Sequence, residues 1–277
     1  MIIVVSDVHA AERKDDPQVK DDDAKFLEFL NHIASQELKA GGELVLLGDI
    51  IDLWRRDFVL ALMESEPIIS KLIEMSSNIR IYYLIGNHDF HMLRMSELTD
   101  TFPFKVTKDL RLKEGGKKYF FIHGYQLEVL ANPYYKSLSA YEAFCEGLCL
   151  AGDDTGNAAD KLWETYQASK SALDNLKRLP TNISETLTSM MKLPDKRLSG
   201  SHKAHSLIDK LAISKAREVY LGMKTDEILV FGHTHDPFCE AEDEVVNTVN
   251  TGSWKKRPNQ NYTYLEISGG RVEQQTF

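Results

Sequence analysis

The chain has 277 residues, of which 43% are hydrophobic, and carries a formal net charge of −9. This length suits one large domain or a domain with an insertion, and the hydrophobic content is typical of a globular protein with a substantial core. The acidic balance argues against a broad nucleic-acid-binding surface. It still permits a phosphate-bearing substrate, because bound cations reverse the local electrostatic field.

The three cysteines do not make a disulfide framework. Cys145 and Cys149 lie four residues apart in a helical pattern, which favours buried small apolar residues over a zinc or redox pair. We therefore expect a reducing, cytoplasmic location. The N-terminal apolar run is short and lacks a basic leader, so we expect no signal peptide, and no apolar stretch is long enough for a transmembrane segment.

The first half of the chain alternates predicted strands and helices. Buried strands are expected at 2–5, 43–47 and 79–85. After the first strand, Asp22 or Asp23 is expected to cap a helix that ends at Gly41 and Gly42. The segment 105–124 then predicts a hairpin that turns at Gly115 and Gly116.

From about residue 134 to 220 the strand pattern is replaced by helical spacing, which predicts a helical insertion. Strands resume with the segments EILVF, EVVNTV and NYTYLEIS, and a turn is expected at Gly269 and Gly270. Strand–helix alternation followed by hairpins predicts an α/β fold with mixed sheets, in one domain that covers residues 1–277.

Polar residues that can bind metals follow five of the predicted strands. They are Asp7 and His9, then Asp49 and Asp52, then Asn87, His88 and Asp89, then His123, then His233 and His235. In α/β sheets, ligands bind at the carboxyl ends of the strands. Capping of the next helix could explain polar residues after one strand. Polar residues after five strands instead favour a metal site at the edge of the sheet where these strands end. Carboxylate, amide and imidazole groups without thiolate suit Mn, Fe, Zn, Co or Ni.

The motifs Asp-x-His, Gly-Asp-x-x-Asp, Gly-Asn-His-Asp, a lone His and Gly-His-x-His occur in this order. This pattern resembles the calcineurin-like metallophosphoesterases, and the resemblance covers about 1–130 and 225–277. It implies a four-layer αββα sandwich of two mixed β-sheets with a helical insertion. It also implies two divalent metal ions, with Mn²⁺ foremost and Fe, Zn, Co or Ni as alternatives.

The same resemblance assigns roles to individual residues. The first metal would be held by Asp7, His9, Asp49 and His235, and the second by Asp49, Asn87, His123 and His233. His88 would act as an acid or stabilise the phosphoryl group, and Asp89 would orient it. Asp52 would steady a ligand histidine from behind.

The implied activity is hydrolysis of a phosphomonoester, phosphodiester or pyrophosphate bond by a metal-bridging hydroxide, with a small nucleotide or lipid-linked substrate favoured. The sequence contains neither a Gly-x-Ser-x-Gly nucleophile elbow nor a phosphate-binding loop of nucleotide-triphosphate motors. A nuclease of the same superfamily is the closest alternative, which the net charge disfavours. A non-catalytic scaffold with the same fold is disfavoured because every ligand position is intact.

The phrases SDVHA, GDIIDLW, GNHDF, HGYQLE and NTGSW, together with the place of the insertion, resemble the UDP-2,3-diacylglucosamine pyrophosphohydrolases of lipid A synthesis. Those enzymes have Arg where this chain has His88, so their specificity does not carry over directly. We expect the insertion to lie over or beside the metal edge, where it either shapes the choice of substrate or serves in packing or oligomerisation. The oligomeric state is not predicted.

Overall fold

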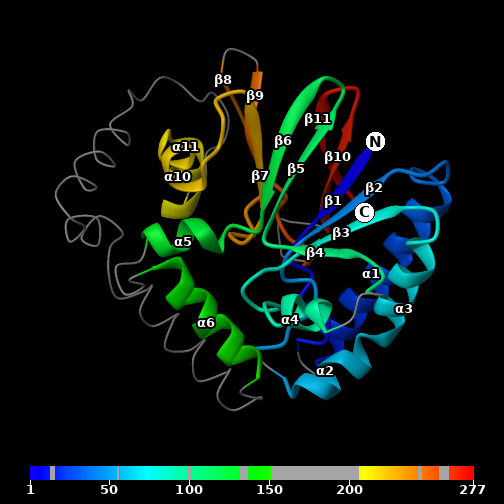
Figure 1. Cartoon of the computed structure of the whole chain (residues 1–277). Coiled ribbons are helices and arrows are strands. Elements are labelled where there is room, and N and C mark those ends of the chain that lie inside the picture. Colours follow the sequence, from blue (N-terminus) through cyan, green and yellow to red (C-terminus); the bar gives the residue numbers. More distant parts are fainter. Residues whose placement is uncertain are drawn as a thin grey trace.

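The computed structural model describes residues 1–12, 16–54, 56–98, 102–131, 137–150, 206–242, 245–255 and 262–277. Two mixed β-sheets face each other, and helices cover their outer faces (Figure 1). This arrangement confirms the αββα sandwich. Among the helices in these ranges, none is long and apolar enough to cross a membrane.

The first sheet has the strand order β11-β10-β1-β2-β3-β4. Its strands are β1 (Ile2–Val5), β2 (Glu43–Leu47), β3 (Arg80–Leu84), β4 (Lys105–Thr107), β10 (Thr263–Ser268) and β11 (Arg271–Thr276). Strands β1 to β4 run parallel, and β10 and β11 add an antiparallel hairpin at one edge. The central strands are nearly continuous apolar runs, as expected where both faces of a sheet are covered.

The second sheet has the order β5-β6-β7-β9-β8. Its strands are β5 (Asp109–Glu114), β6 (Lys117–Ile122), β7 (Glu227–Phe231), β8 (Phe238–Glu242) and β9 (Val245–Asn250). Strands β6, β7 and β9 are parallel, whereas β5 and β8 pair antiparallel at the two edges. The carboxyl ends of β6 and β7 therefore lie side by side.

The predicted hairpin is present as β5 and β6, but its first arm is shorter than expected. Lys105–Thr107 forms β4, which pairs with Tyr82–Leu84 of β3 in the first sheet. The chain then crosses to the second sheet, where β5 begins at Asp109. The apolar residues Val106, Leu110 and Leu112 keep to even-numbered positions on both sides of the crossing, so the sequence pattern did not reveal it.

Helices α1 (Pro17–Ser35), α2 (Phe58–Glu64), α3 (Glu66–Met75) and α4 (Met92–Glu97) lie on the side of the first sheet (Figure 1). Helix α1 begins earlier than predicted, because the side chain of Asp16 accepts a hydrogen bond from the backbone N–H of Gln18, and Pro17 occupies the first turn. Asp22, an expected cap, is instead buried inside the helix and accepts a hydrogen bond from Tyr262 Oη at 2.7 Å.

Helices α5 (Tyr125–Ala131), α10 (Leu207–Ile213) and α11 (Ala216–Leu221) lie beside the second sheet, and α6 (Leu138–Cys149) continues from α5 towards α4 (Figure 1). The predicted insertion is thus helical in 138–149, 207–213 and 216–221. Its central part, 151–205, lies outside the described residues.

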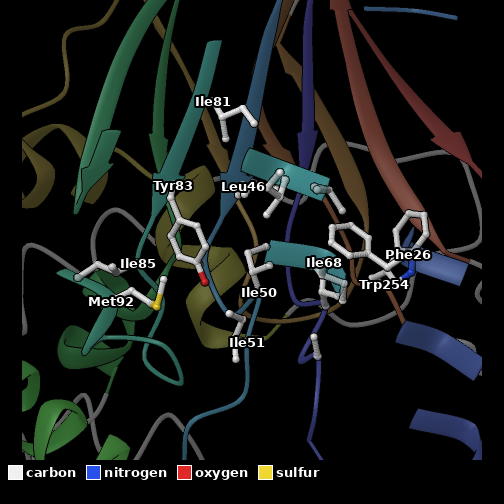
Figure 2. Packing of buried hydrophobic residues seen from close by; sticks show 14 of the residues in the cluster. Phe26, Leu46, Ile50, Ile51, Ile68, Ile81, Tyr83, Ile85, Met92 and Trp254 are labelled. Atoms are coloured by element: carbon white, nitrogen blue, oxygen red, sulfur yellow. The ribbon is translucent and has the colours of Figure 1, made fainter. Parts of the chain in front are cut away.

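Three clusters of buried side chains fill the spaces between the layers. Successive residues of β2 show why both of its faces are apolar. Leu44 and Leu46 belong to the cluster beneath α1 and α3, whereas Val45 and Leu47 belong to the cluster between the two sheets. Figure 2 shows the first cluster, in which Leu46 and Ile81 point from neighbouring strands towards the helices.

Trp254, in the loop after β9, ties α1 to the first sheet. Its fully buried ring lies 4.6 Å from that of Phe29 and 5.3 Å from that of Phe26 (Figure 2). Its backbone N–H donates to the carbonyl oxygen of Asp7 at 3.2 Å, so the same residue also touches the loop that follows β1.

Replacement of Trp254 by Ala should lower the free energy of unfolding by about 3–5 kcal/mol, because it opens a large cavity that neighbouring rings cannot fill. Urea denaturation measures this change. Val219→Ala, at a residue that is 73% exposed, serves as the control and should change stability little. Equal stabilities of the two variants would contradict the role given to Trp254.

Candidate metal centre

The loops after β1, β2, β3, β6 and β7 meet at one edge of the sandwich, where the sequence predicts metal ligands. Among the described residues, three groups of side chains have ligand atoms that all lie within 4.8 Å of one another, and two of these groups consist of predicted ligands alone. The first group contains Asp7, His9 and His235, and the second contains Asp49, His123 and His233. These residues come from both sheets, so the site exists only when the sandwich is closed.

In the first group, Nε2 of His235 lies 3.0 Å from Oδ1 of Asp7 and 3.4 Å from Nε2 of His9. In the second group, Nε2 of His123 lies 3.1 Å from Oδ2 of Asp49. Oδ2 of Asp49 also lies 3.8 Å from Nε2 of His9. The Asp49 carboxylate therefore faces both groups, as a carboxylate that bridges two cations must.

Asn87 follows β3 and has 5% of its surface exposed. Its Oδ1 is buried without a hydrogen-bond partner. Buried oxygens without a partner are costly unless something outside the chain, such as a cation, interacts with them. The next residue, His88, donates its backbone N–H to Oδ1 of Asp49 at 2.8 Å, which connects the Asn87 loop to the second group.

Three of the candidate ligand histidines are oriented by a hydrogen bond from the nitrogen that points away from the site. Nδ1 of His9 lies 3.1 Å from Oδ2 of Asp52, and Nδ1 of His123 lies 2.8 Å from the carbonyl oxygen of Leu47. Nε2 of His233 lies 3.0 Å from Oε2 of Glu128. With a proton on each of these nitrogens, the other nitrogen presents its lone pair to the centre.

The backbone at these strand ends is strained. Among the described residues, six other than glycine have positive φ, and five of the six are candidate ligands: Asp7, His9, Asp49, His233 and His235. Such conformations cost of the order of 1–3 kcal/mol each and are retained where neighbouring structure enforces them. Here hydrogen bonds between loops do so, since the N–H of Asp7 donates to the carbonyl of Gly48, and the N–H of His9 to that of Asp49.

Two glycines permit the close approach of these loops. A Cβ atom on Gly86 would meet the backbone N of Asp49 at 2.5 Å and would also contact its carboxylate. A Cβ atom on Gly232 would contact the side chains of Ser6 and Asp7. Gly86 and Gly232 thus need to lack a side chain because a candidate ligand from another loop lies against each of them. A single motif does not reveal this contact.

The charges of the site also fit a cation. Burial would raise the pKa of Asp7, but His235 and His123 lower that pKa to about 2. Burial would lower the pKa of His123, but Asp49 and Asp7 raise that pKa to about 10. The pKa of Asp49 is lowered in spite of its burial, chiefly by His123. The raised pKa of His123 thus lets its imidazolium compensate the carboxylates in the metal-free protein, and a divalent cation would replace that proton.

His88 occupies a defined position beside the first group. Its Nδ1 lies 3.1 Å from Oδ2 of Asp52, the same oxygen that faces His9, and its ring stacks on Trp54 with centroids 4.2 Å apart. His9, Asp52 and His88 also lie close enough to one another to hold a metal ion. We interpret Asp52 as a positioning carboxylate, because both of its histidine contacts use Nδ1 at hydrogen-bond distance.

The expectation that Asp89 orients His88 is wrong. The Asp89 carboxylate accepts hydrogen bonds from the N–H groups of Gly86 and Ile50, at 2.6 and 2.8 Å, and from Tyr83 Oη at 2.7 Å. Asp89 therefore holds the loops after β2 and β3 together, and the carboxylate that orients His88 is that of Asp52. Burial and the Asp49 charge raise the pKa of Asp89 to about 6.

Sequence reasoning missed Glu128 and Asp209. Glu128 is 3% exposed and contacts His233 from α5, and Asp209 of α10 accepts a hydrogen bond from Thr234 Oγ1 at 2.8 Å. The signal for Glu128 was an acidic residue between the apolar residues Leu127 and Val129 of a helix, five residues after His123. The contact of Asp209 has no signal in the sequence, because the helix lies far from Thr234 along the chain.

Gly86→Ala should strongly lower the metal content of the purified protein, because the added methyl group would displace the Asp49 carboxylate. Elemental analysis after dialysis measures this content. Gly147→Ala is the matched control, since a Cβ atom there meets nothing within 4 Å. Unchanged metal content in Gly86→Ala would refute the role given to Asp49.

Metal binding at pH 7 should release protons, because His123, with its pKa raised to about 10, is protonated in the metal-free protein. Metal affinity should therefore increase as the pH rises from 6 to 8. Calorimetric titrations in two buffers with different ionisation enthalpies measure the number of protons released. Identical heats in both buffers would show that no proton leaves.

Comparison with known proteins supports this chemistry at the level of the family. A family model described as calcineurin-like phosphoesterase matches residues 1–237. The fold resembles that of a dimetal phosphatase from Danio rerio, with 13% identity, a TM-score of 0.51, and coverage of 99% of this chain and 94% of that one.

An archaeal phosphodiesterase is also similar, with 13% identity, a TM-score of 0.41, and coverage of 100% of this chain and 99% of that one. A search of curated proteins returned no match. The family match spans both candidate ligand groups, and the arrangement of two mixed sheets between helices agrees with it. The chain therefore belongs to the calcineurin-like phosphoesterase family.

Proposed function

We propose that the protein is a metal-dependent phosphoesterase that uses two divalent cations, with Mn²⁺ the first choice, to hydrolyse a phosphomonoester, phosphodiester or pyrophosphate bond. The observation that carries this proposal is the position of the Asp49 carboxylate, which belongs to the group of His123 and His233 and also faces His9 of the other group. Both groups lie at the carboxyl edge of the strands, where α/β sheets bind their ligands.

The first cation would be held by Asp7, His9, Asp49 and His235, and the second by Asp49, Asn87, His123 and His233. Bound there, two cations supply an activated water at neutral pH and neutralise charge on the phosphoryl oxygens. In this proposal the protein side chains have three further tasks in catalysis. They fix the geometry of the ligands, exclude solvent and donate protons.

His88 is the residue that we assign to proton donation or to stabilisation of the phosphoryl group. Its Nδ1 is turned to Asp52, and we assign the other ring nitrogen, Nε2, to a substrate oxygen. The stacked ring of Trp54 limits rotation of the imidazole. The buried Asp52 carboxylate favours the imidazolium form, which is the form that donates a proton to a leaving group.

We further propose a small nucleotide or lipid-linked substrate rather than nucleic acid, in line with the net charge of −9. The position of helix α6 beside His88 and Trp54 supports a substrate that has an apolar part in addition to its phosphate. Its Phe144 ring lies 6.3 Å from that of Trp54 and is 43% exposed, and Sγ of Cys149 lies 3.4 Å from the carbonyl oxygen of His88. A lipid joined to a nucleotide through a pyrophosphate bond is one substrate of this kind. Free buried thiols at Cys145 and Cys149 accord with the proposed cytoplasmic location.

A substrate screen tests the proposed function. Protein stripped of metal and reloaded with Mn²⁺ should hydrolyse at least one of three probes, namely nitrophenyl phosphate, bis(nitrophenyl) phosphate and a nucleotide-sugar pyrophosphate. Asp49→Asn, treated identically, should lose most of the activity. The proposal fails if the reloaded protein binds two equivalents of metal and hydrolyses none of these classes.

His88→Ala should retain its metals and lower kcat by about 10²–10⁴-fold, the usual contribution of a positioned acid or base. The loss should be smaller for nitrophenyl esters than for alkyl esters, because a good leaving group needs little protonation. His32→Ala, at a half-exposed histidine of α1, is the matched control. An equal loss for both kinds of ester would show that His88 stabilises charge without donating a proton.

A further inference from the structure

Glu128 is a buried acid whose carboxylate lies between the metal site and the helical insertion. It is 3% exposed, and its Oε2 lies 3.0 Å from Nε2 of His233. The same oxygen accepts a hydrogen bond from Tyr141 Oη at 2.6 Å. One carboxylate oxygen thus connects a candidate ligand on the loop after β7 to helix α6.

The position of Glu128 determines which nitrogen of His233 is available to a cation. Nδ1 of His233 lies 3.3 Å from Nε2 of His123, on the side of the second ligand group. This nitrogen has a free lone pair only when the proton of the neutral ring is on Nε2. A carboxylate at Nε2 favours that tautomer and makes the imidazole a stronger ligand, as carboxylate partners of metal-binding histidines do.

Tyr141 holds Glu128 in place. The tyrosine is 2% exposed, and its ring stacks on that of Tyr125, with centroids 5.8 Å apart and an interplanar angle of 24°. Its hydroxyl can therefore reach Glu128 only while α6 is packed against α5. The rotamer of the carboxylate, and through it the orientation of His233, depends on that packing.

A second contact joins the metal loop to the other described flank of the insertion. Asp209, which is fully buried in α10, accepts a hydrogen bond from Thr234 Oγ1 at 2.8 Å. Thr234 stands between His233 and His235, whose φ values of 69° and 57° need support from outside the loop. Helices on both sides of residues 151–205 thus hold the Gly-His-Thr-His loop.

We infer that Glu128 is a positioning residue that sets metal affinity at the second position, and that Tyr141 makes this affinity depend on the packing of α6. The inference rests on the proposed two-metal function, and it assigns to the insertion a role in metal binding in addition to any role in substrate choice. Because binding and packing are linked, occupation of the second position should in turn stabilise α6.

Calorimetric titration of metal-stripped protein with Zn²⁺ tests the inference. The unsubstituted protein should show two binding events. In Glu128→Ala and Glu128→Gln, one event should weaken by about 10- to 100-fold, the usual effect of loss of such a partner, while the other event is unchanged. Tyr141→Phe should weaken the same event to a smaller extent.

Glu142→Gln is the matched control, because this residue of α6 also accepts a hydrogen bond from a tyrosine, Tyr125, at 3.2 Å. Its described partners, Tyr125 and Lys108, are not candidate ligands. Zn²⁺ binding in Glu142→Gln should equal that of the unsubstituted protein. If this variant weakens the same event as strongly as Glu128→Gln, the effect comes from general loosening of α6 and the inference is wrong.

Nitrogen-15 NMR of the ring of His233 gives a second readout. The metal-free protein should show the proton on Nε2, and Glu128→Ala should show a mixture of tautomers, a change that a purely structural role would not produce. This measurement in Tyr141→Phe remains informative if the Glu128 variants do not fold. Unchanged affinities and tautomers would overturn the inference while the two-metal proposal stands, whereas failure of the unsubstituted protein to bind Zn²⁺ would overturn both.

Discussion

The buried carboxylate of Asp49 joins the two sheets at the edge where the loops meet. It belongs to the loop after β2 in the first sheet, and its Oδ2 lies 3.1 Å from His123, which follows β6 in the second. Its Oδ1 accepts the backbone N–H of His88. A buried carboxylate is stable only with positive charge or hydrogen-bond donors around it. The loops after β2, β3 and β6 must therefore converge on this one side chain.

A similar contact joins the sheets through Asp7. Its Oδ2 accepts the backbone N–H of His233 at 3.0 Å, and its Oδ1 faces His235. Candidate ligands that follow strands of one sheet thus form hydrogen bonds or ion pairs with those that follow strands of the other. The strained conformations at these positions are compensated by the apolar clusters on either side, which hold the strands in register up to the point where the loops begin.

The insertion is more than an addition to this edge. Helix α6 contacts the loop of His88 through Cys149, and it contacts His233 indirectly through Tyr141 and Glu128. Helix α10 contacts Thr234 through Asp209. The described parts of the insertion thus touch the same loops that carry the candidate ligands.

The sequence by itself determined the fold class and the candidate ligands. Buried strands and the residues that follow them are local features, because a run such as ELVLL and the next Gly-Asp are adjacent in the chain. The parallel order of the strands then follows from the alternation with helices, and the strand ends are brought to one edge. Asp7, Asp49, His123 and their counterparts could therefore be named without coordinates.

The tertiary structure alone decided which partner each of these side chains meets. Asp89 is next to His88 in the sequence, whereas Asp52 is 36 residues away. Only the packing of the loops shows that Asp52 faces the ring of His88, while Asp89 accepts hydrogen bonds from backbone N–H groups. The contact of Glu128 with His233 joins residues 105 positions apart. The crossing of the chain between β4 and β5 depends on the neighbouring strands in the same way. Local sequence patterns specify the chemistry that a residue can perform. The partner of that residue depends on which distant segments lie next to it. Burial and hydrogen bonding across the whole sandwich determine that arrangement.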